Sequence, residues 1–452
     1  MYYEKAFYMD ADEEMTGEKL CGYITKHRLL VNRYNELKNL YVGDQDILYL
    51  APKPTTKPDN RLVANFARYI VDTFNGYFMG SPVKTVSGDE RVSDYIQMLE
   101  RYNNVDDLNA DLSKKCDIYG HAFELLYLDE MAQVGITQIA PSECILVRST
   151  SIRETPLYGI RYTATSDGKT VGTISDASVI RYFEIRGADV TVTDEKPNYF
   201  GAVPIIEYVE NEERIGAFEW VEYLINAYNK AISEKANDVD YFADAYMKIL
   251  GAKLDESVLS QIRDYRIINL EKTGGDGQLV VDFMQKPNAD ATQEHLLERI
   301  EKLIFNLSMV PNINDEKFGT ASGIALQYKL QSMSNLAKTK ERKFARGFNE
   351  RYRLIANLPN SAIQSDDLVG IDYKFTRNIP ANVRDEAETA RSLQGIVSDE
   401  TILENLSIVT DVKQELERIE DENKLEPMME MHEHGDIEGG SEDAESALGE
   451  TL

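Results

Sequence analysis

The stretch FEWVEYLINAYNKAISEKANDVDYFADAYMKILG, residues 218–251, decides the fold. Neither Gly nor Pro interrupts it between Phe218 and Leu250, and it ends on Gly251, a residue typical of the position just after a helix. At about 1.5 Å per residue, a helix over this span is roughly 50 Å long. The sequence therefore predicts one long helix over residues 218–250.

The two sides of this predicted helix differ in chemistry. Trp220, Leu224, Tyr228 and Val239 share a largely apolar side. The opposite side carries a polar stripe without Lys or Arg, formed by Asn226, Asn229, Ser233, Asn237, Asp240 and Asp244. The stripe fits either an ordinary solvated helix face or a neutral-to-acidic wall facing something that must not adhere.

The residues before this helix mix helix and strand patterns. A helical arm over Thr16–Leu40 and a Pro-rich connector over Pro52–Pro58 are expected within residues 1–60. A helix follows, with Asn60 as its cap and Gly76 just after its end. Four short runs read as strands: PSECILVRS, YGIRYTAT, ASVIRYFEI and VPIIEYV. The fold class predicted for residues 61–217 is α+β.

The residues after the long helix form a compact insert and then further helices. RIINL and QLVVDFM are two β-like runs within 251–290, and the glycine-rich EKTGGDG between them predicts that they form a hairpin. Helices are predicted over 291–309, 323–358, 383–393, 401–406 and 412–426, with a strand ending at Pro380. The cations between Lys338 and Arg353 are expected to form salt bridges to acidic neighbours. The acidic tail, 427–452, is expected to be disordered.

Composition excludes several classes of protein. The chain has 49 Lys and Arg against 78 Asp and Glu, a net charge of -29, so strong phosphate binding over a large face is not expected. Contact with DNA that slides past is compatible with this charge. The three cysteines form no CxxC pair, which fits a reducing compartment. No signal peptide or apolar span is present, so a soluble protein made in a cytoplasm, without a membrane partner, is expected.

Catalytic motifs occur only as fragments. There is no P-loop, GxGxxG or GxSxG pattern. Ser81 and Lys84 match SxxK, and Lys272 begins a KTG, but such short patterns arise by chance and their SDN partner is missing. We predict no catalytic residue, no metal site and no cofactor. A cytoplasmic hydrolase with a cryptic site near Ser81 and Lys84 stays as a minor alternative.

The order of the pieces resembles the portal proteins of long-tailed bacteriophages. The resemblance runs from about residue 60 to 425, and long segments in the same order carry it: YIVDTFNGYFMGSPV (69–83), CDIYGHAFELLYLDE (116–130), PSECILVRSTSIRETPLYGIRY (141–162), the run from VPIIEYV to MKILG (203–251), FGTASGIALQYKL (318–330) and FTRNIPANVRDEAE (375–388). The N-terminal arm and the acidic tail lie outside it.

The resemblance implies a portal fold. Its parts are an α/β wing (61–217, completed by the long helix and closing strand of 324–380), a helical stem (218–250 and 291–310), a small α/β clip (251–290), a tunnel loop (311–323) and a helical crown (381–426). The expected channel-facing residues are the polar stripe of the stem and, in the tunnel loop, Asn312, Asn314, Lys317 and Phe318. Lys272 and Asp276 of the clip are the expected docking residues.

The resemblance also implies a function without catalysis. Twelve copies, or thirteen when isolated, would form a ring at one capsid vertex through which double-stranded DNA is packaged and ejected. The implied partners are the terminase large subunit, a head-completion adaptor, and the scaffolding and major capsid proteins. The ring would belong to the virion and assemble in the cytoplasm of the bacterial host. A similar ring in a defective prophage or gene-transfer particle is the alternative.

Overall fold

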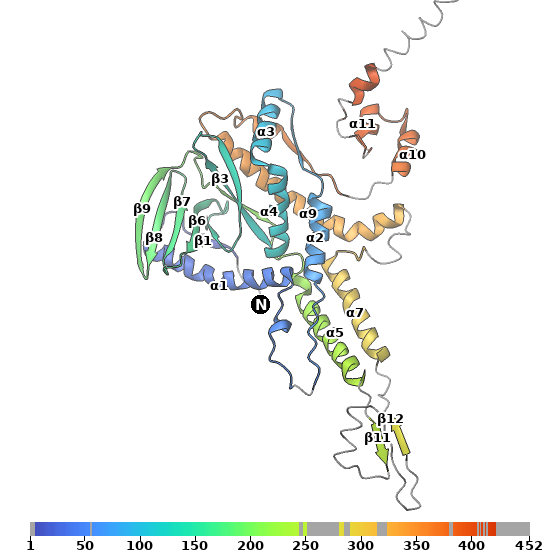
Figure 1. The fold of residues 1–452 in the computed structure, drawn as a ribbon. Coiled ribbons are helices and arrows are strands. Elements are labelled where there is room, and N and C mark those ends of the chain that lie inside the picture. The colour runs from blue at the N-terminus through green and yellow to red at the C-terminus, as the bar shows by residue number, and fades with distance from the viewer. Residues whose placement is uncertain are drawn as a thin grey trace, which may run out of the picture. The chain divides into compact units, whose positions relative to one another are not determined.

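The computed structural model describes residues 5–54, 57–243, 247–250, 280–283, 290–313, 323–378 and 383–404, and, between 405 and 421, residues 406, 408–409, 412 and 415–421 (Figure 1). Two compact units divide the chain: Met1–Thr320 with Leu326–Asn378, and Ala321–Ala325 with Ile379–Leu452. Helices and sheets mix throughout the first unit, so the predicted α+β class is confirmed. No helix among the described residues is long and apolar enough to cross a membrane.

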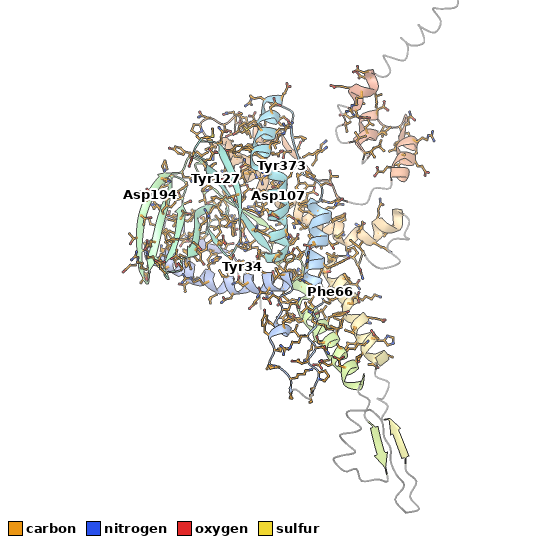
Figure 2. The ribbon with its side chains drawn as sticks, in the orientation of Figure 1. Tyr34, Phe66, Asp107, Tyr127, Asp194 and Tyr373 are labelled. Carbon is orange, nitrogen blue, oxygen red and sulfur yellow. The ribbon has the colours of Figure 1, made fainter. Side chains whose placement is uncertain are left out.

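The N-terminal arm is a helix that packs into the first unit. Helix α1 spans Gly17–Val42, and the side chain of Thr16 caps it by accepting from the N–H of Lys19. Gly43 ends it in a left-handed conformation, with φ at 88°. The buried positions recur every three or four residues: Leu20, Ile24, His27, Leu30, Tyr34, Leu37 and Leu40. The predicted helix is confirmed, and Figure 2 shows Tyr34 on it.

A six-stranded sheet packs against the first half of α1. Its order is β1 (Phe7–Met9), β5 (Cys144–Ser149), β6 (Pro156–Ala164), β7 (Thr170–Ser175), β8 (Val179–Arg186) and β9 (Asp189–Pro197). Only β1 runs parallel to its neighbour, β5. Ile160, Ile174 and Phe183 bury one face of the sheet in a cluster with Leu20 and Ile24.

A second sheet and four helices surround the main core. The sheet orders β10 (Ile205–Val209), β3 (His121–Leu128) and β4 (Val134–Ile139), all antiparallel. The helices are α2 (Phe66–Met79), α3 (Glu90–Asn103), α4 (Val105–Tyr119) and α9 (Gly323–Ala356). Gly347 lets α9 approach the sheet, because a Cβ there would lie 2.3 Å from the ring of Tyr208. A strand pair, β2 (Lys84–Ser87) with β13 (Ile371–Lys374), and two short 3₁₀ turns, η1 (Asp46–Tyr49) and η3 (Asp367–Gly370), complete this part of the chain.

The long helix predicted over 218–250 is shorter than expected. After the 3₁₀ turn η2 (Glu219–Val221), helix α5 spans Glu222–Ala243, and Met247–Leu250 is a strand, β11. β11 pairs antiparallel with β12 (Val280–Phe283), so the prediction of helix up to Leu250 is wrong. A strand partner distant in sequence overrides a local pattern that allows helix. QLVVDFM does contain a strand, whereas RIINL lies outside the described residues.

Helix α2 also begins later than predicted. Its cap is Asn65, whose side chain accepts from the N–H of Arg68, and not Asn60. Gly76 lies inside the helix rather than after it. The residues from Asn60 to Ala64 stay extended because their backbone bonds to another helix, as described below.

The remaining helices match their predictions more closely. α7 spans Asp290–Ser308 and α9 spans Gly323–Ala356, each within two residues of the predicted bounds. In the second unit, α10 (Val383–Leu393) has the predicted bounds, and α11 (Asp399–Glu404) is capped by Ser398, which accepts from the N–H of Thr401. Residues 415–421 are helical. The predicted acidic tail lies outside the described residues.

Candidate functional site: the α5–α7 helix pair and its anchors

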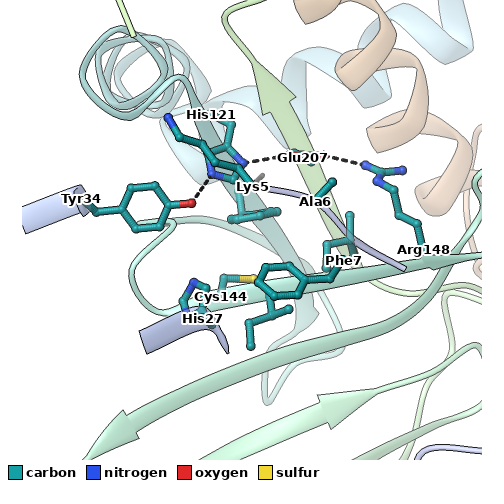
Figure 3. A pocket seen from close by; sticks show the side chains of 12 residues that line it. Lys5, Ala6, Phe7, His27, Tyr34, His121, Cys144, Arg148 and Glu207 are labelled. Carbon is teal, nitrogen blue, oxygen red and sulfur yellow. Dashed lines mark hydrogen bonds and ion pairs between the residues drawn. The ribbon is translucent and has the colours of Figure 1, made fainter. Parts of the chain in front are cut away.

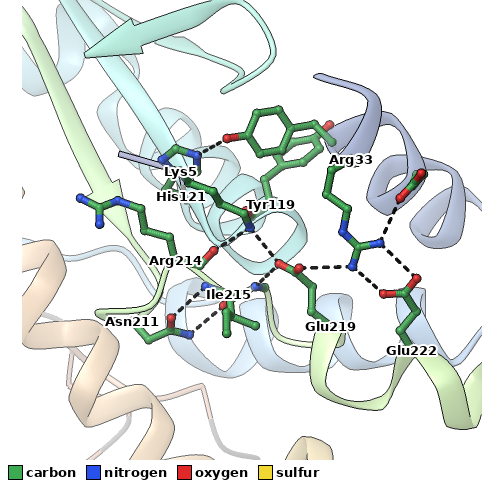
Figure 4. A network of polar contacts seen from close by, with 12 residues as sticks. Lys5, Arg33, Tyr119, His121, Asn211, Arg214, Ile215, Glu219 and Glu222 are labelled. Atoms are coloured by element: carbon green, nitrogen blue, oxygen red, sulfur yellow. Dashed lines mark hydrogen bonds and ion pairs between the residues drawn. The ribbon is translucent and has the colours of Figure 1, made fainter. Parts of the chain in front are cut away.

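The start of α5 and the turn before it are tied to α1 by a guanidinium, which also binds Glu36 on its own helix. Arg33 of α1 lies 2.5 Å from Glu222 Oε2 and 3.3 Å from Glu219 Oε2 (Figure 4). Burial lowers the pKa of Arg33, but its hydrogen bonds to Glu222 and the nearby charges outweigh this and hold the pKa above its ordinary value. The bidentate geometry fixes the direction in which α5 leaves the core.

Lys5 joins the same point from the N-terminal strand. Its Nζ donates to the carbonyl oxygens of Tyr119 (2.9 Å) and Arg214 (2.7 Å) and to Glu219 Oε1 (3.1 Å). Burial lowers the pKa of Lys5, and the charge of Glu219 opposes that shift. Four segments far apart in sequence therefore meet where α5 begins.

A buried polar centre lies beside this junction. Tyr34 Oη donates to His121 Nε2 and His121 Nδ1 donates to Glu207 Oε1, each at 2.8 Å (Figure 3). Glu207 also binds Arg148 at 2.8 Å. Burial raises the pKa of Glu207, but the hydrogen bonds from His121 and Arg214 hold it well below its usual value. The adjoining cavity encloses about 10 Å³, room for one water rather than a substrate, so this centre is structural.

The polar stripe of α5 binds the extended segment 60–64, which we call the connector strand. Three backbone N–H groups donate to three side chains: Ala64 to Asn229 Oδ1 (2.8 Å), Leu62 to Ser233 Oγ (2.9 Å) and Asn60 to Asn237 Oδ1 (2.6 Å). These contacts satisfy backbone donors that would otherwise be buried without partners.

The expected channel-facing stripe is therefore only partly exposed. Asn229, Ser233 and Asn237 are 1%, 4% and 6% exposed, because they lie beneath the connector strand. Within the chain these three residues form no open wall. Asn226 is exposed, and so is Asp240, which accepts from Asn60 Nδ2 at 2.5 Å. Asp244 lies outside the described residues.

Helices α5 and α7 pack against each other in opposite directions. Lys235 of α5 forms an ion pair with Glu294 near the start of α7. Phe66, labelled in Figure 2, bridges Tyr228 and Phe305, with ring centroids 4.9 Å and 5.7 Å apart. Because the later part of α5 meets the first turns of α7, the pair is an antiparallel hairpin of helices.

The segment after α7 is anchored where it begins. Tyr69 Oη of α2 donates to the carbonyl oxygen of Pro311 (3.2 Å) and accepts from the N–H of Ile313 (2.8 Å). Asn312 is half-buried, with its Nδ2 3.5 Å from Glu301 Oε1. The other predicted tunnel-loop and docking residues lie outside the described part of the chain: Asn314, Lys317, Phe318, Lys272 and Asp276.

One feature of the helix pair was not predicted from the sequence. Large apolar side chains project into solvent from both helices and from the turn η2 before α5: Trp220 is 60% exposed, Tyr223 76%, Leu296 52% and Leu307 54%. The sequence predicted an apolar side of α5, but not that part of it is uncovered. Within the described residues, no three His, Cys, Asp or Glu side chains gather to hold a metal ion.

Known proteins resemble this chain over most of its length. The portal protein of Bacillus phage SPP1 is 24% identical over 423 residues, covering 86% of this chain and 81% of the relative. The portal protein of Clostridium phage phiCD119 is 23% identical over 232 residues, half of each chain. A chain in the neck of an empty gene transfer agent particle aligns with a TM-score of 0.46 and 12% identity, covering 75% of this chain and 88% of that one.

A family model extends over nearly the whole chain. The family described as "Phage portal protein, SPP1 Gp6-like" matches residues 22–426, from the first turns of α1 to beyond the last described residue. The match includes most of α1, which the resemblance drawn from the sequence had left out. The chain therefore belongs to the SPP1 Gp6-like family of phage portal proteins.

Proposed function

We propose that twelve copies of this chain assemble into a ring at one capsid vertex, and that double-stranded DNA is packaged and ejected through its central channel. The observation that carries the proposal is the family match over residues 22–426. Portal proteins are structural ring components and not enzymes, which sets aside the hydrolase alternative. Both curated relatives come from phages, which favours a phage particle.

The exposed apolar side chains of α5 and α7 support assembly. Trp220, Tyr223, Leu296 and Leu307 are each more than half exposed. Exposed large apolar groups on neighbouring elements are typical of protein contact surfaces. In a ring each copy contacts its two neighbours through different faces. One helix of the pair can therefore pack against one neighbouring copy and the other helix against the second.

The portal parts follow the observed elements. We assign α5 and α7 to the stem, and β11 and β12 to the clip, because the helix stops at Ala243. The clip would dock the terminase large subunit and the head-completion adaptor, with Lys272 and Asp276 at the contact. The helices after residue 383 would form the crown, while the sheets with α1 to α4 and α9 would form the wing. Scaffolding and major capsid proteins are the remaining partners, met during assembly in the host cytoplasm.

The channel residues are reassigned from the whole stripe to its exposed members. Asn226 and Asp240 remain candidates on α5, joined by the loop residues Asn312, Asn314, Lys317 and Phe318. With a net charge of -29 per copy, a ring repels phosphate weakly from all sides, which favours passage over retention. Lys317 then offers each copy one transient phosphate contact.

Particle mass tests assembly. Twelve copies of the 51.3 kDa chain weigh about 616 kDa, and negative-stain images of that fraction should show rings with a central hole. Added to a portal-deficient lysate, such rings should restore DNA packaging. A chain that stays monomeric even with scaffolding and capsid proteins, and restores no packaging, would remove the proposal.

A single substitution tests the loop assignment. Rings carrying Lys317→Gln should package DNA at a rate different from the unchanged ring, because the one cation of the loop is lost. Lys302→Gln is the matched control: it removes an exposed cation of α7 with no ion pair in the described structure. Equal packaging rates for both variants and the unchanged ring would exclude a role for Lys317.

A further inference from the structure

The exposed face of α9 carries amides and cations, and the two carboxylates at its edges, Glu341 and Glu350, bind Arg377 and Arg353. Residues spaced three or four apart lie on one side of a helix, and here all of them are exposed: Gln327, Gln331, Asn335, Lys338, Arg342, Arg346, Asn349 and Arg353. We call this set the α9 basic face. The chain as a whole has 78 acidic and 49 basic residues, so an excess of cations over carboxylates on one helix face is the reverse of its overall composition.

Within the described part of the chain, four cations on or beside this face have no acidic partner. Lys338, Arg342, Lys343 and Arg346 form no ion pair with any residue that the structure describes. The carboxylate nearest to them in sequence, Glu341, forms an ion pair with Arg377. The sequence had predicted salt bridges for the cations of this helix, and the described residues supply none for these four.

The other cations of α9 do find partners and fix the rotation of the helix. Lys340 is fully buried, 2.6 Å from Asp117 and 2.9 Å from Glu210. Arg351 is also buried and binds Glu124 through two nitrogens. These side chains point into the core and fix the rotation of α9 about its axis. The α9 basic face, on the opposite side of the helix, therefore points outward.

The chemistry of this face favours a polyanion over another protein surface. The centre of a protein–protein interface is normally apolar and aromatic, yet the face has no apolar residue between Gln331 and Arg353. Lys, Arg, Asn and Gln are the side chains that contact phosphate and sugar in protein–DNA complexes. Lys338 and Arg346 are about 12 Å apart along the helix, a distance that spans several phosphates of one strand.

We propose that the α9 basic face binds the backbone of duplex DNA without reading its sequence. The inference rests on the proposed function for the presence of DNA, but the site is separate from the tunnel loop and from the stripe on α5. Binding through three or four phosphates is weak at physiological salt and is readily reversed.

Salt-dependent binding of a short labelled duplex to the assembled, full-length protein tests this proposal. Each lost phosphate contact lowers the slope of log K against log salt by about 0.9, so Lys338→Gln with Arg342→Gln and Arg346→Gln should lower it by about 2.7. At about 0.1 M salt the affinity should fall at least tenfold, equally for duplexes of unrelated sequence. Exchanging the same residues as Lys338→Arg, Arg342→Lys and Arg346→Lys should keep the binding.

The control variant removes the same charge elsewhere. Lys26→Gln, Lys38→Gln and Arg153→Gln change exposed cations that have no ion pair in the described structure, and should leave the slope unchanged. Equal losses in both triple variants, or no binding by the unchanged protein, would overturn the proposal. So would a first triple variant that loses the ring but binds DNA normally, since its partner would then be a neighbouring copy. Ring mass and packaging report on the channel independently of this binding.

Discussion

The backbone N–H of Ala64 donates a 2.8 Å hydrogen bond to Oδ1 of Asn229, a side chain that is only 1% exposed. The Nδ2 of the same amide donates to Oε1 of Gln45 at 2.6 Å. One asparagine of α5 thereby joins the end of the arm and the connector strand, and each of its two polar atoms has a partner.

Removing this amide should destabilise the protein. Asn229→Ala leaves the N–H of Ala64 and the side chain of Gln45 buried without partners, which costs about 1–3 kcal/mol for each such group. The free energy of unfolding in urea measures the loss, and limited proteolysis between residues 50 and 60 should become faster. Asn226→Ala, an exposed change on the same helix, should stay within about 0.5 kcal/mol. Equal stability of the two variants would contradict the role of the connector strand.

Lys340 should be among the costliest residues to replace. Lys340→Met removes the cation that lies between the buried carboxyls of Asp117 and Glu210, which costs about 3–5 kcal/mol. Lys338→Met, two residues along and exposed, is the matched control, with an expected change near zero. Chemical denaturation measures both. A small loss for Lys340→Met would mean that the carboxyls find protons or water instead.

His27 should make stability depend on pH. Burial lowers its pKa from 6.5 to about 4, while the hydrogen bond to Pro141 O opposes the shift. The unfolded chain therefore takes up a proton at a higher pH than the folded one, so the contribution is complete above pH 6.5 and is lost as pH falls towards 4. The whole loss amounts to about 3 kcal/mol.

Comparison of His27→Gln with the unchanged chain isolates this contribution. Between about pH 7 and pH 5, the unfolding free energy of the unchanged chain should fall more steeply than that of His27→Gln. His295→Gln, at an exposed position on α7, should keep the steeper fall. Parallel curves for the unchanged chain and His27→Gln would exclude the histidine as the source.

Two glycines should respond oppositely to alanine. Gly120 has φ at 84°, and a Cβ there would lie 1.9 Å from the carbonyl oxygen of Arg214, so Gly120→Ala should cost more than about 2 kcal/mol. Gly22 lies inside α1 with no atom within 4 Å of the added Cβ, and Gly22→Ala should stabilise the chain by about 1 kcal/mol. Thermal unfolding of both variants checks the pair. Shifts of the same sign would contradict this reading of the two sites.

The sequence predicted those elements whose local signals agree with their packing. Helix α9 keeps its apolar spacing from end to end and was found within two residues of its bounds. Predictions from local sequence were wrong where a contact with a segment distant in sequence determines the local structure. Met247–Leu250 allows helix but pairs with Val280–Phe283, and Asn60 could cap a helix but bonds instead to Asn237.

The site was predictable in chemistry but not in orientation. A polar helix face is predicted by the four-residue spacing of Asn229, Ser233 and Asn237. The hydrogen-bonding groups of such side chains can be satisfied equally well by water or by the backbone of another segment. Only the fold reveals that the connector strand fills this role. The α9 basic face could not be predicted for a similar reason, because the sequence does not tell which cations of the helix form ion pairs.

The bonds between the connector strand and α5 have a consequence for chain length. Two residues of extended chain advance about 6.6 Å, and four residues of helix about 6.0 Å, so successive bonds drift by only about 0.6 Å. Every second N–H of the connector strand can therefore bond to every fourth side chain of α5. Inserting one residue between positions 60 and 64 would turn the next N–H away from α5. Natural relatives should therefore exclude odd-numbered insertions within this strand.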